Sequence, residues 1–237
     1  MNILDDYFMT SFEVESLYTN IPLKETIDII VNSIYDNGNM VRNMSKNDFK
    51  KLLELVTEDN FIIFNNKFLK QKDGLAMGNP VSAVFANIFM CHHEKKWLEL
   101  CPARYKPILY RRYVDDTYLI FKSHTDVEPF FNYLNRQHRK INFTLEQESE
   151  GRIPFLDMMV YKNSGKLNFS VFRKPTFTGL GINFLSECFT QYKINSIKTL
   201  VHRAFKLSSS FHCIFLLCHL RFNGNNITSL HNKLKNY

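Results

Sequence analysis

The chain has 237 residues, of which 45% are hydrophobic and 22% are charged. This length and composition allow a buried core and argue against disorder. The five cysteines form no CxxC pair and no Cys/His set with zinc-finger spacing, which predicts reduced thiols in an intracellular protein and no cysteine-based metal site. The start of the chain lacks the basic and apolar regions of a signal peptide, and the apolar residues 213–218 are too few to span a bilayer. We therefore expect a soluble protein in which residues 213–218 belong to a buried helix.

The net charge of +7 is unevenly distributed along the chain. Residues 161–237 contain 11 Lys and Arg residues and one acid, Glu187, whereas residues 1–160 contain 19 bases and 22 acids. The basic segment indicates a polyanionic partner, although a solvated basic surface has the same composition. The acidic remainder is compatible with a metal-binding centre.

The first elements alternate between strand and helix. Residues 7–14 are predicted to form a strand, and Pro22 suits the first position of a helix over residues 23–35. Ser45 and Asp48 have the spacing of a capping box at the start of a second helix. The next predicted elements are a hairpin of residues 61–64 and 67–70 around Asn65-Asn66, a glycine-rich bend at residues 74–80 and a helix over residues 81–100.

Residues 109–114 and 117–121 are β-prone runs separated by Asp115-Asp116, which predicts a hairpin with two acids at its tip. Thr125 is expected to cap the following helix. The remaining predicted elements are strands at residues 142–148, 155–161 and 167–172, a turn at Asn163-Ser164-Gly165 and a basic helical region from about residue 191. This order indicates an α+β fold with a helical extension.

Two adjacent carboxylates on a hairpin are well placed for divalent metals, because Mg²⁺ prefers one or two carboxylates together with substrate phosphates. Two such ions can activate a 3′-hydroxyl and stabilise the leaving oxygen during displacement at phosphorus. Asp115 and Asp116 are therefore candidate metal ligands. The alternative is an ordinary turn, in which the flanking Arg111 and Arg112 neutralise the acids.

Two other segments carry candidate site residues. Gly74 and Gly78 precede a helix and would allow the backbone to approach a phosphate or base pair, although such glycines are usually only a loop. Glu13 ends the first predicted strand, and Tyr18 follows five residues later. The structural alternative is a solvent-facing acid at Glu13 and a core aromatic at Tyr18.

The order of these segments is that of the palm motifs of reverse transcriptases. Four phrases closely resemble Penelope-like retroelement reverse transcriptases: Ser16-Leu17-Tyr18-Thr19-Asn20-Ile21-Pro22, Asp73-Gly74-Leu75-Ala76-Met77-Gly78, Ile153-Pro154-Phe155-Leu156-Asp157 and Phe172-Arg173-Lys174-Pro175-Thr176. The resemblance covers nearly the whole chain. It implies a right-hand polymerase palm, an antiparallel sheet with packed helices, over residues 1–180, followed by a helical basic thumb over residues 181–237.

The resemblance also implies an activity, a cofactor and partners. The activity is RNA-directed DNA polymerisation with two Mg²⁺ ions, or Mn²⁺, acting on an RNA template, a DNA primer and deoxynucleoside triphosphates, and the family implies a nuclear location. By position, Glu13, Asp115 and Asp116 would be the catalytic metal ligands. Tyr18 would screen the incoming sugar.

The remaining implied site residues lie in two segments of the resemblance. Gly74, Gly78 and Asn79 would position template and nucleotide, with Asn79 in place of a more usual Ser. Arg173 and Lys174 would guide the primer, with an ordinary basic turn as the alternative. Asp157 is expected to support a strand turn.

Two departures from the family bear on activity. Glu13 replaces the family's first aspartate, and its longer side chain would place the carboxylate about 1.5 Å farther out, where a misplacement of about 1 Å can cost about 100-fold in rate. The first palm strand begins within a dozen residues of Met1, so we also expect the fingers to be absent. The chain stops after the expected thumb, so we expect a GIY-YIG endonuclease to be absent as well. The sequence thus supports an impaired polymerase or a non-catalytic nucleic-acid-binding remnant, and an ordinary α+β domain only if all four phrases are coincidental.

Overall fold

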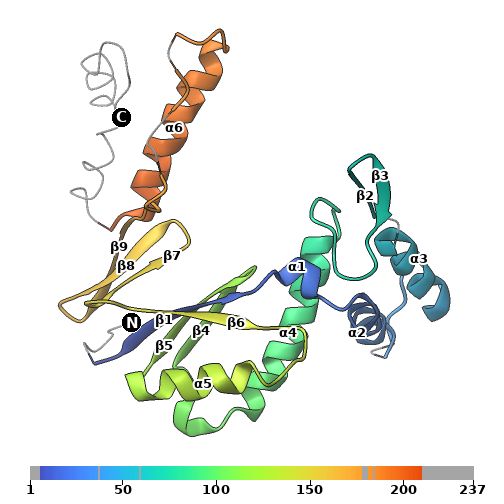
Figure 1. The fold of residues 1–237 in the computed structure, drawn as a ribbon. Coiled ribbons are helices and arrows are strands. Elements are labelled where there is room, and N and C mark those ends of the chain that lie inside the picture. Colours follow the sequence, from blue (N-terminus) through green and yellow to red (C-terminus); the bar gives the residue numbers. More distant parts are fainter. Residues whose placement is uncertain (1–5, 37, 59, 178–180, 184, 210–237) are drawn as a thin grey trace. The chain divides into compact units, whose positions relative to one another are not determined.

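The computed structural model describes residues 6–209, except residues 37, 59, 178–180 and 184 (Figure 1). The described residues form two compact units, residues 6–149 and residues 150–209. Each unit combines antiparallel strands with helices, so the predicted α+β class is confirmed. The palm–thumb boundary expected between residues 180 and 181 stays a prediction.

A four-stranded antiparallel sheet organises residues 6–149 (Figure 1). Its strands are, in spatial order, β4 (Leu109–Tyr113), β5 (Asp116–Phe121), β1 (Phe8–Val14) and β6 (Phe143–Gln147). β1 therefore lies inside the sheet, paired with β5 on one side and with β6 on the other. The first strand of the unit is therefore fixed by backbone pairing with two strands that come more than a hundred residues later in the chain.

The two faces of this sheet differ because side chains alternate along each strand. On one face, Phe12 of β1 contacts Phe130 and Phe131, and Phe121 of β5 also contacts Phe130. These two phenylalanines belong to α5 (Val127–Leu134), so this is the core face of the sheet. Glu13 follows Phe12 along β1 and lies on the opposite face, where it is exposed although Met9 and Ile120 of the same face are buried.

The helices of this unit contribute the rest of its core. They are α1 (Leu17–Asn20), α2 (Leu23–Tyr35), α3 (Lys46–Glu58), α4 (Ser82–Leu100) and α5. α2 packs against α3 and α4, and its buried Ile27 joins Phe89 and Trp97 of α4 in one core cluster. The helices predicted over residues 23–35 and 81–100 are thus present, the second beginning one residue later than expected.

Local signals decided several element boundaries. The Asp48 N–H donates to Ser45 Oγ (3.2 Å) and the Ser45 hydroxyl donates to the Asp48 carboxylate (2.6 Å), as the capping spacing predicted. The predicted turn residues Asn65 and Asn66 both have positive φ, at 50° and 57°, and join β2 (Phe61–Phe64) to β3 (Lys67–Lys70). Asn tolerates this left-handed backbone better than most residues, so the turn forms where its sequence allows it.

Two capping predictions were wrong in detail. Pro22 is not the first helical residue of α2 but the preceding one, and its carbonyl accepts the Thr26 N–H (3.0 Å). Ser123, not Thr125, provides the cap before α5: its hydroxyl accepts the Thr125 N–H (3.2 Å) at the start of a short 3-10 turn. The two hydroxyls are only two residues apart, and the 3-10 turn moved the cap to the earlier one.

Residues 150–209 form the second unit, a three-stranded antiparallel sheet and one long helix. The strands are β7 (Arg152–Phe155), β8 (Met158–Asn163) and β9 (Lys166–Val171), and α6 (Thr190–Leu207) contacts β9. The single strand predicted over residues 155–161 was wrong, because a turn at Leu156-Asp157 divides it between β7 and β8. Leu156 has a positive φ of 55°, a conformation that its apolar side chain gave no reason to expect.

Several predictions concern cysteines, apolar segments and membranes. Cys91, Cys101 and Cys188 are free thiols among the described residues. The helix expected around residues 213–218 lies outside the described residues. In the part of the chain that the structure describes, no helix has the length and apolar character needed to cross a membrane.

Candidate functional site

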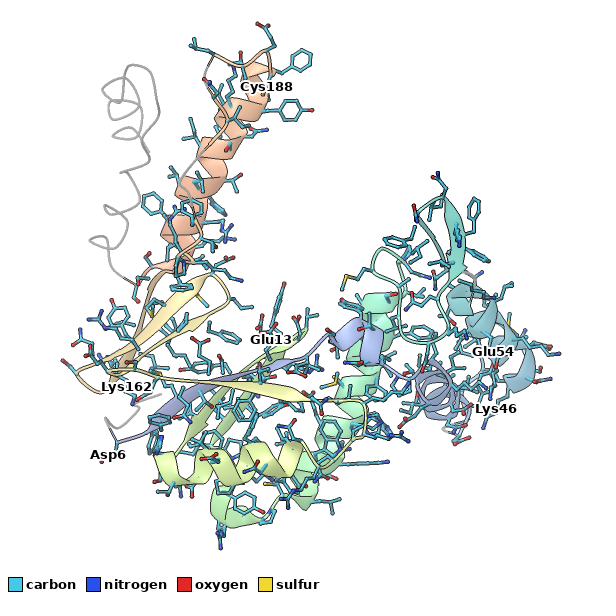
Figure 2. All side chains as sticks on the ribbon, in the orientation of Figure 1. Asp6, Glu13, Lys46, Glu54, Lys162 and Cys188 are labelled. Atoms are coloured by element: carbon cyan, nitrogen blue, oxygen red, sulfur yellow. The ribbon has the colours of Figure 1, made fainter. Side chains whose placement is uncertain are left out.

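Pairing between β1 and β5 brings Glu13 beside Asp116. The two residues are register partners on adjacent antiparallel strands, so their side chains emerge on the same face of the sheet. The Val14 N–H donates to the Asp115 carbonyl (2.9 Å), which fixes the neighbouring turn against the end of β1. Glu13 is exposed (Figure 2). Both aspartates are half-buried, so a ligand can reach this end of the sheet.

The hairpin that carries the two aspartates differs from the predicted one. Tyr113 pairs with Asp116, so the tip consists of Val114 and Asp115, and Asp116 is the first residue of β5. Val114 has a positive φ of 57°, which is a genuine outlier for a β-branched residue and stores backbone strain. Strain of this kind is concentrated at functional sites, where surrounding contacts must hold it in place.

Arg112 supplies the contacts that hold this turn. It pairs with Thr117 across the hairpin, and Thr117 pairs with Phe12 of the core face, so Arg112 projects toward the helices and away from Glu13 and Asp116. Its guanidinium donates to the Glu94 carboxylate of α4 (Nε–Oε1 2.7 Å) and to the Val114 carbonyl (2.9 Å). The alternative in which Arg112 neutralises the aspartates is therefore wrong.

The pair of Arg112 and Glu94 is buried, with 6% and 10% of their side chains exposed. Burial alone would lower the pKa of Arg112, but the hydrogen bond and the charge of Glu94 raise it overall. The Tyr110 hydroxyl also donates to Glu94 Oε1 (2.6 Å), and burial followed by the Glu94 charge raises the pKa of Tyr110. This network ties β4 to α4 directly beneath the Val114–Asp115 turn.

Sequence reasoning missed Glu94, and one signal could have found it. Ser82, Ala86 and Met90 are spaced four residues apart and are buried along one face of α4, and Glu94 continues the same series. An acid on the buried stripe of a helix requires a partner, because an unpaired buried charge is costly. The sequence contained this acid but gave no indication that Arg112 is its partner.

The ligand atoms of Glu13, Asp115 and Asp116 are farther apart than those of another cluster. Among the described residues, one group of three His, Cys, Asp or Glu side chains has all its ligand atoms within 4.8 Å of one another, and it consists of Glu25, His93 and His138. Glu13, Asp115 and Asp116 share a strand end without reaching that proximity. Their donor chemistry, carboxylate oxygens on one accessible edge, nevertheless suits a hard divalent cation.

The glycine-rich bend lies against Tyr18. The Leu75 N–H donates to the Tyr18 carbonyl (2.7 Å), and Tyr18 packs, half-buried, against the core cluster. Gly74 has a φ of +82°, and a Cβ at this position would collide with the backbone of Thr19. Only glycine fits there, so the structure gives a physical reason for Gly74 and brings two predicted site segments together.

Other residues of the bend are held by hydrogen bonds. The Asn79 side-chain amide donates to the Val56 carbonyl of α3 (2.9 Å), and its oxygen accepts the Val81 N–H (3.1 Å) at the entrance to α4. Gly78 is exposed, with a φ of +100° and open space around it. Asn79 thus has a structural role in this bend, and nucleotide contacts by Asn79 or Gly78 stay predictions.

Asp73 anchors the start of the bend. Its carboxylate forms an ion pair with Lys140 and accepts the N–H groups of Gly74 (2.9 Å) and Leu23 (3.2 Å). Burial raises the pKa of Asp73, but these hydrogen bonds outweigh it and lower the pKa overall. The bend is therefore tied both to α2 and to the connection between α5 and β6.

Arg173 and Lys174, the predicted primer contacts, belong to the second unit. The Arg173 guanidinium lies over the Phe177 ring (4.2 Å to its centroid), and burial lowers the pKa of Arg173 together with the charge of Arg203. The Lys174 carbonyl accepts the Phe177 N–H (2.8 Å). Both residues thus form an ordered basic turn, and primer guidance stays a prediction.

Asp157 occupies the turn between β7 and β8. Its carbonyl accepts the Phe172 N–H (2.8 Å), and its carboxylate pairs with Arg203 of α6. These two contacts hold the turn against the end of β9 and against α6. They agree with the structural role expected for Asp157.

Comparisons with known proteins identify the fold. No protein-family model matches the chain, and no curated protein sequence matches it. Solved structures of telomerase do match: telomerase from Candida albicans in complex with a telomeric RNA fragment (TM-score 0.59, 12% identity, 90% of this chain and 39% of that chain) and apo telomerase from Candida tropicalis truncated from its C-terminal domain (TM-score 0.54, 17% identity, 68% and 35%). The chain spans less than half the length of these telomerases. At such low identity the likeness concerns the fold alone, and the chain has a reverse-transcriptase-like fold.

Proposed function

We propose that this chain is a reverse transcriptase domain of the Penelope-like retroelement type, which extends a DNA primer on an RNA template. The observation that carries the proposal is the register pairing of Glu13 with Asp116, beside the Val114–Asp115 turn, at the end of a sheet in a reverse-transcriptase-like fold. The reverse-transcriptase-like fold supports nucleotidyl transfer as the proposed reaction, and the four sequence phrases support the Penelope-like type.

In the proposed reaction, the primer 3′-oxygen attacks the α-phosphorus of a deoxynucleoside triphosphate. A new P–O bond forms, the bond to pyrophosphate breaks, and the proton of the 3′-hydroxyl passes to water. Glu13, Asp115 and Asp116 would hold two Mg²⁺ ions, which when bound would activate the 3′-oxygen and stabilise the charge on the leaving pyrophosphate.

The residues around this edge have proposed roles in binding. Tyr18 would contact the sugar of the incoming nucleotide, and the backbone of the bend from Gly74 to Gly78 would approach the base pair, with Asn79 setting the bend's position. Arg173 and Lys174 would bind primer phosphates, and the basic helical region beyond residue 180 would serve as the thumb. Their support is sequence resemblance and positive charge.

Primer extension by the 237-residue chain on poly(rA) with oligo(dT) tests this proposal. With Mg²⁺ or Mn²⁺ we expect weak incorporation of dTTP, because the longer side chain of Glu13 places its carboxylate about 1.5 Å farther out than that of an aspartate. Glu13→Asp should raise the rate by up to about 100-fold, and Asp116→Asn should abolish it. Glu128→Gln, an exposed acid on α5, is the matched control that should leave the rate unchanged.

A second candidate function is nucleic-acid binding without chemistry. The observation that favours it is the net charge of +10 over residues 161–237 together with Glu13 in place of an aspartate. It predicts affinity for an RNA/DNA hybrid that falls steeply with salt, and no extension even by the Glu13→Asp variant. Binding that does not depend on salt would contradict this second function. Primer extension by the unchanged chain or by the Glu13→Asp variant would support the polymerase instead.

A further inference from the structure

A cluster of two histidines and a glutamate lies apart from the carboxylates of the proposed polymerase site. Glu25 comes from the first turn of α2, His93 from α4 and His138 from the connection between α5 and β6. Glu25 Oε1 lies 2.9 Å from His93 Nε2, and Glu25 Oε2 lies 3.3 Å from His138 Nε2. One carboxylate thus faces two imidazole nitrogens from three elements that are distant in the sequence.

The donor set matches a transition metal rather than Mg²⁺. Two imidazole nitrogens and one carboxylate form a common three-ligand Zn²⁺ set, whereas Mg²⁺ selects oxygen ligands. Ligand atoms around a tetrahedral Zn²⁺ at about 2.0–2.1 Å lie about 3.3 Å apart. The Glu25–His138 distance of 3.3 Å equals that value and the Glu25–His93 distance of 2.9 Å is slightly shorter, each measured to a different oxygen of Glu25. One ligand atom from each residue can be chosen so that all three lie within 4.8 Å of one another.

The surroundings of the ligand atoms also fit a bound cation. Only 14% of the His93 side chain and 15% of the His138 side chain are exposed, against 41% for Glu25. His93 Nε2 is buried and makes no hydrogen bond of good geometry within the described residues, although it faces Glu25. A buried nitrogen directed at a carboxylate without a proper hydrogen bond is a group for which a shared cation would provide the partner.

We propose that Glu25, His93 and His138 bind one Zn²⁺ ion. Glu25 and the two histidines supply three positions of a tetrahedron, and water occupies the fourth on the exposed side of Glu25. The ring of His93 stacks on Trp97 (5.4 Å between centroids) and contacts Phe89, so the most buried ligand is held by the core.

Two hydrogen bonds of the His138 ring oppose metal binding. The Lys140 N–H donates to His138 Nδ1 (3.2 Å), which places the proton of neutral His138 on Nε2. A metal at Nε2 moves that proton to Nδ1 and opens this hydrogen bond. The metal also replaces the hydrogen bond from His138 Nε2 to Glu25 Oε2 (3.3 Å). Two ordinary hydrogen bonds are therefore lost and three metal–ligand bonds are gained, so binding remains favourable.

The site would join the elements that carry the proposed nucleotide-binding segments. Beside His138, Lys140 pairs with Asp73, and Asp73 accepts the Gly74 N–H at the start of the bend. α2 follows the segment of Tyr18, and α4 follows the glycine-rich bend. A metal bound at Glu25, His93 and His138 would therefore fix the helices behind both segments without contacting substrate.

Direct titration of the metal-free 237-residue chain with Zn²⁺ in a calorimeter tests the proposal. We expect one Zn²⁺ per chain, and Co²⁺ in its place should give the visible absorption of a tetrahedral complex. Glu25→Gln and His138→Gln should each weaken binding by at least about 100-fold, because each removes a ligand. X-ray absorption of the zinc complex should show two imidazole nitrogens, oxygen donors and no sulfur.

His92→Gln is the matched control, since it removes the adjacent imidazole but no proposed ligand. It should bind Zn²⁺ like the unchanged chain, and circular dichroism should show that all variants are folded. His138 lies outside the helices and strands, so its variant tests the site even if changes in α2 or α4 disturb folding. Absence of saturable 1:1 binding, or binding retained by both ligand variants, would show that the cluster is only a hydrogen-bonded one. Neither result depends on primer extension.

Discussion

Arg112→Met tests whether the buried pair with Glu94 holds the hairpin of the candidate site to α4. The Glu94 side chain is 10% exposed, and the substitution removes its arginine partner while the Tyr110 hydroxyl still donates to it. Removing one partner of a buried ion pair costs about 3–5 kcal/mol, because the other charge stays buried without compensation. The Val114 carbonyl loses a donor as well, so the strained turn should also loosen.

The single tryptophan provides the assay. Trp97 is 4% exposed on α4, within the same unit, so its fluorescence reports unfolding of residues 6–149 in urea. Arg112→Met should lower the free energy of unfolding by about 3–5 kcal/mol, whereas Arg111→Met, an exposed neighbour, should change it by less than about 0.5 kcal/mol.

A double-mutant cycle separates the charge from the packing. Glu94→Gln keeps an oxygen that can accept from Tyr110 but leaves Arg112 unpaired, so by itself it should also destabilise the unit. Combined with Arg112→Met it should recover at least about 2 kcal/mol relative to the sum of the single changes, because neither buried charge remains. A loss below about 1 kcal/mol for Arg112→Met, or strict additivity, would refute this account of the network.

Three further predictions concern the bend, the tyrosines and a helix cap. Gly74→Ala should destabilise the chain by about 1–3 kcal/mol, because φ is positive and the new Cβ would collide with the backbone of Thr19. Gly78→Ala, where the space is open, should cost less in the same urea titration. Equal losses for the two variants would exclude the collision as a cause. Burial, and then the charge of Glu148, raises the pKa of Tyr118, so the folded state keeps this phenol neutral. The contribution of the neutral phenol to the free energy of unfolding is complete below pH 10 and should be lost as the pH rises above 10. Denaturation at each pH should show a smaller loss for Tyr118→Phe. Ser45→Ala should cost about 1 kcal/mol by removing the cap of α3, whereas Ser33→Ala within α2 should cost less, and similar unfolding midpoints for both would argue against the capping contribution.

The sequence predicted those parts of the fold that local chemistry controls. The Ser45–Asp48 cap, the Asn65-Asn66 turn and the hairpin around residues 109–121 each depend on residues close in the chain, so their signals could be recognised there. The prediction of one strand over residues 155–161 failed because its local signal was weak. Leucine is not a typical turn residue, yet Leu156 lies in the turn between β7 and β8.

For the site, the sequence by itself determined which chemical groups are available: Glu13, Asp115 and Asp116 as carboxylates, Gly74 as the flexible residue of a bend, and a basic segment at the end. Tertiary structure alone decided which of them meet. Three contacts join residues that are distant in the chain: the strand pairing of Glu13 with Asp116, the ion pair of Arg112 with Glu94, and the cluster of Glu25, His93 and His138. Such contacts depend on sheet register and helix packing, which are set by burial across the whole unit and not by any one segment's residues.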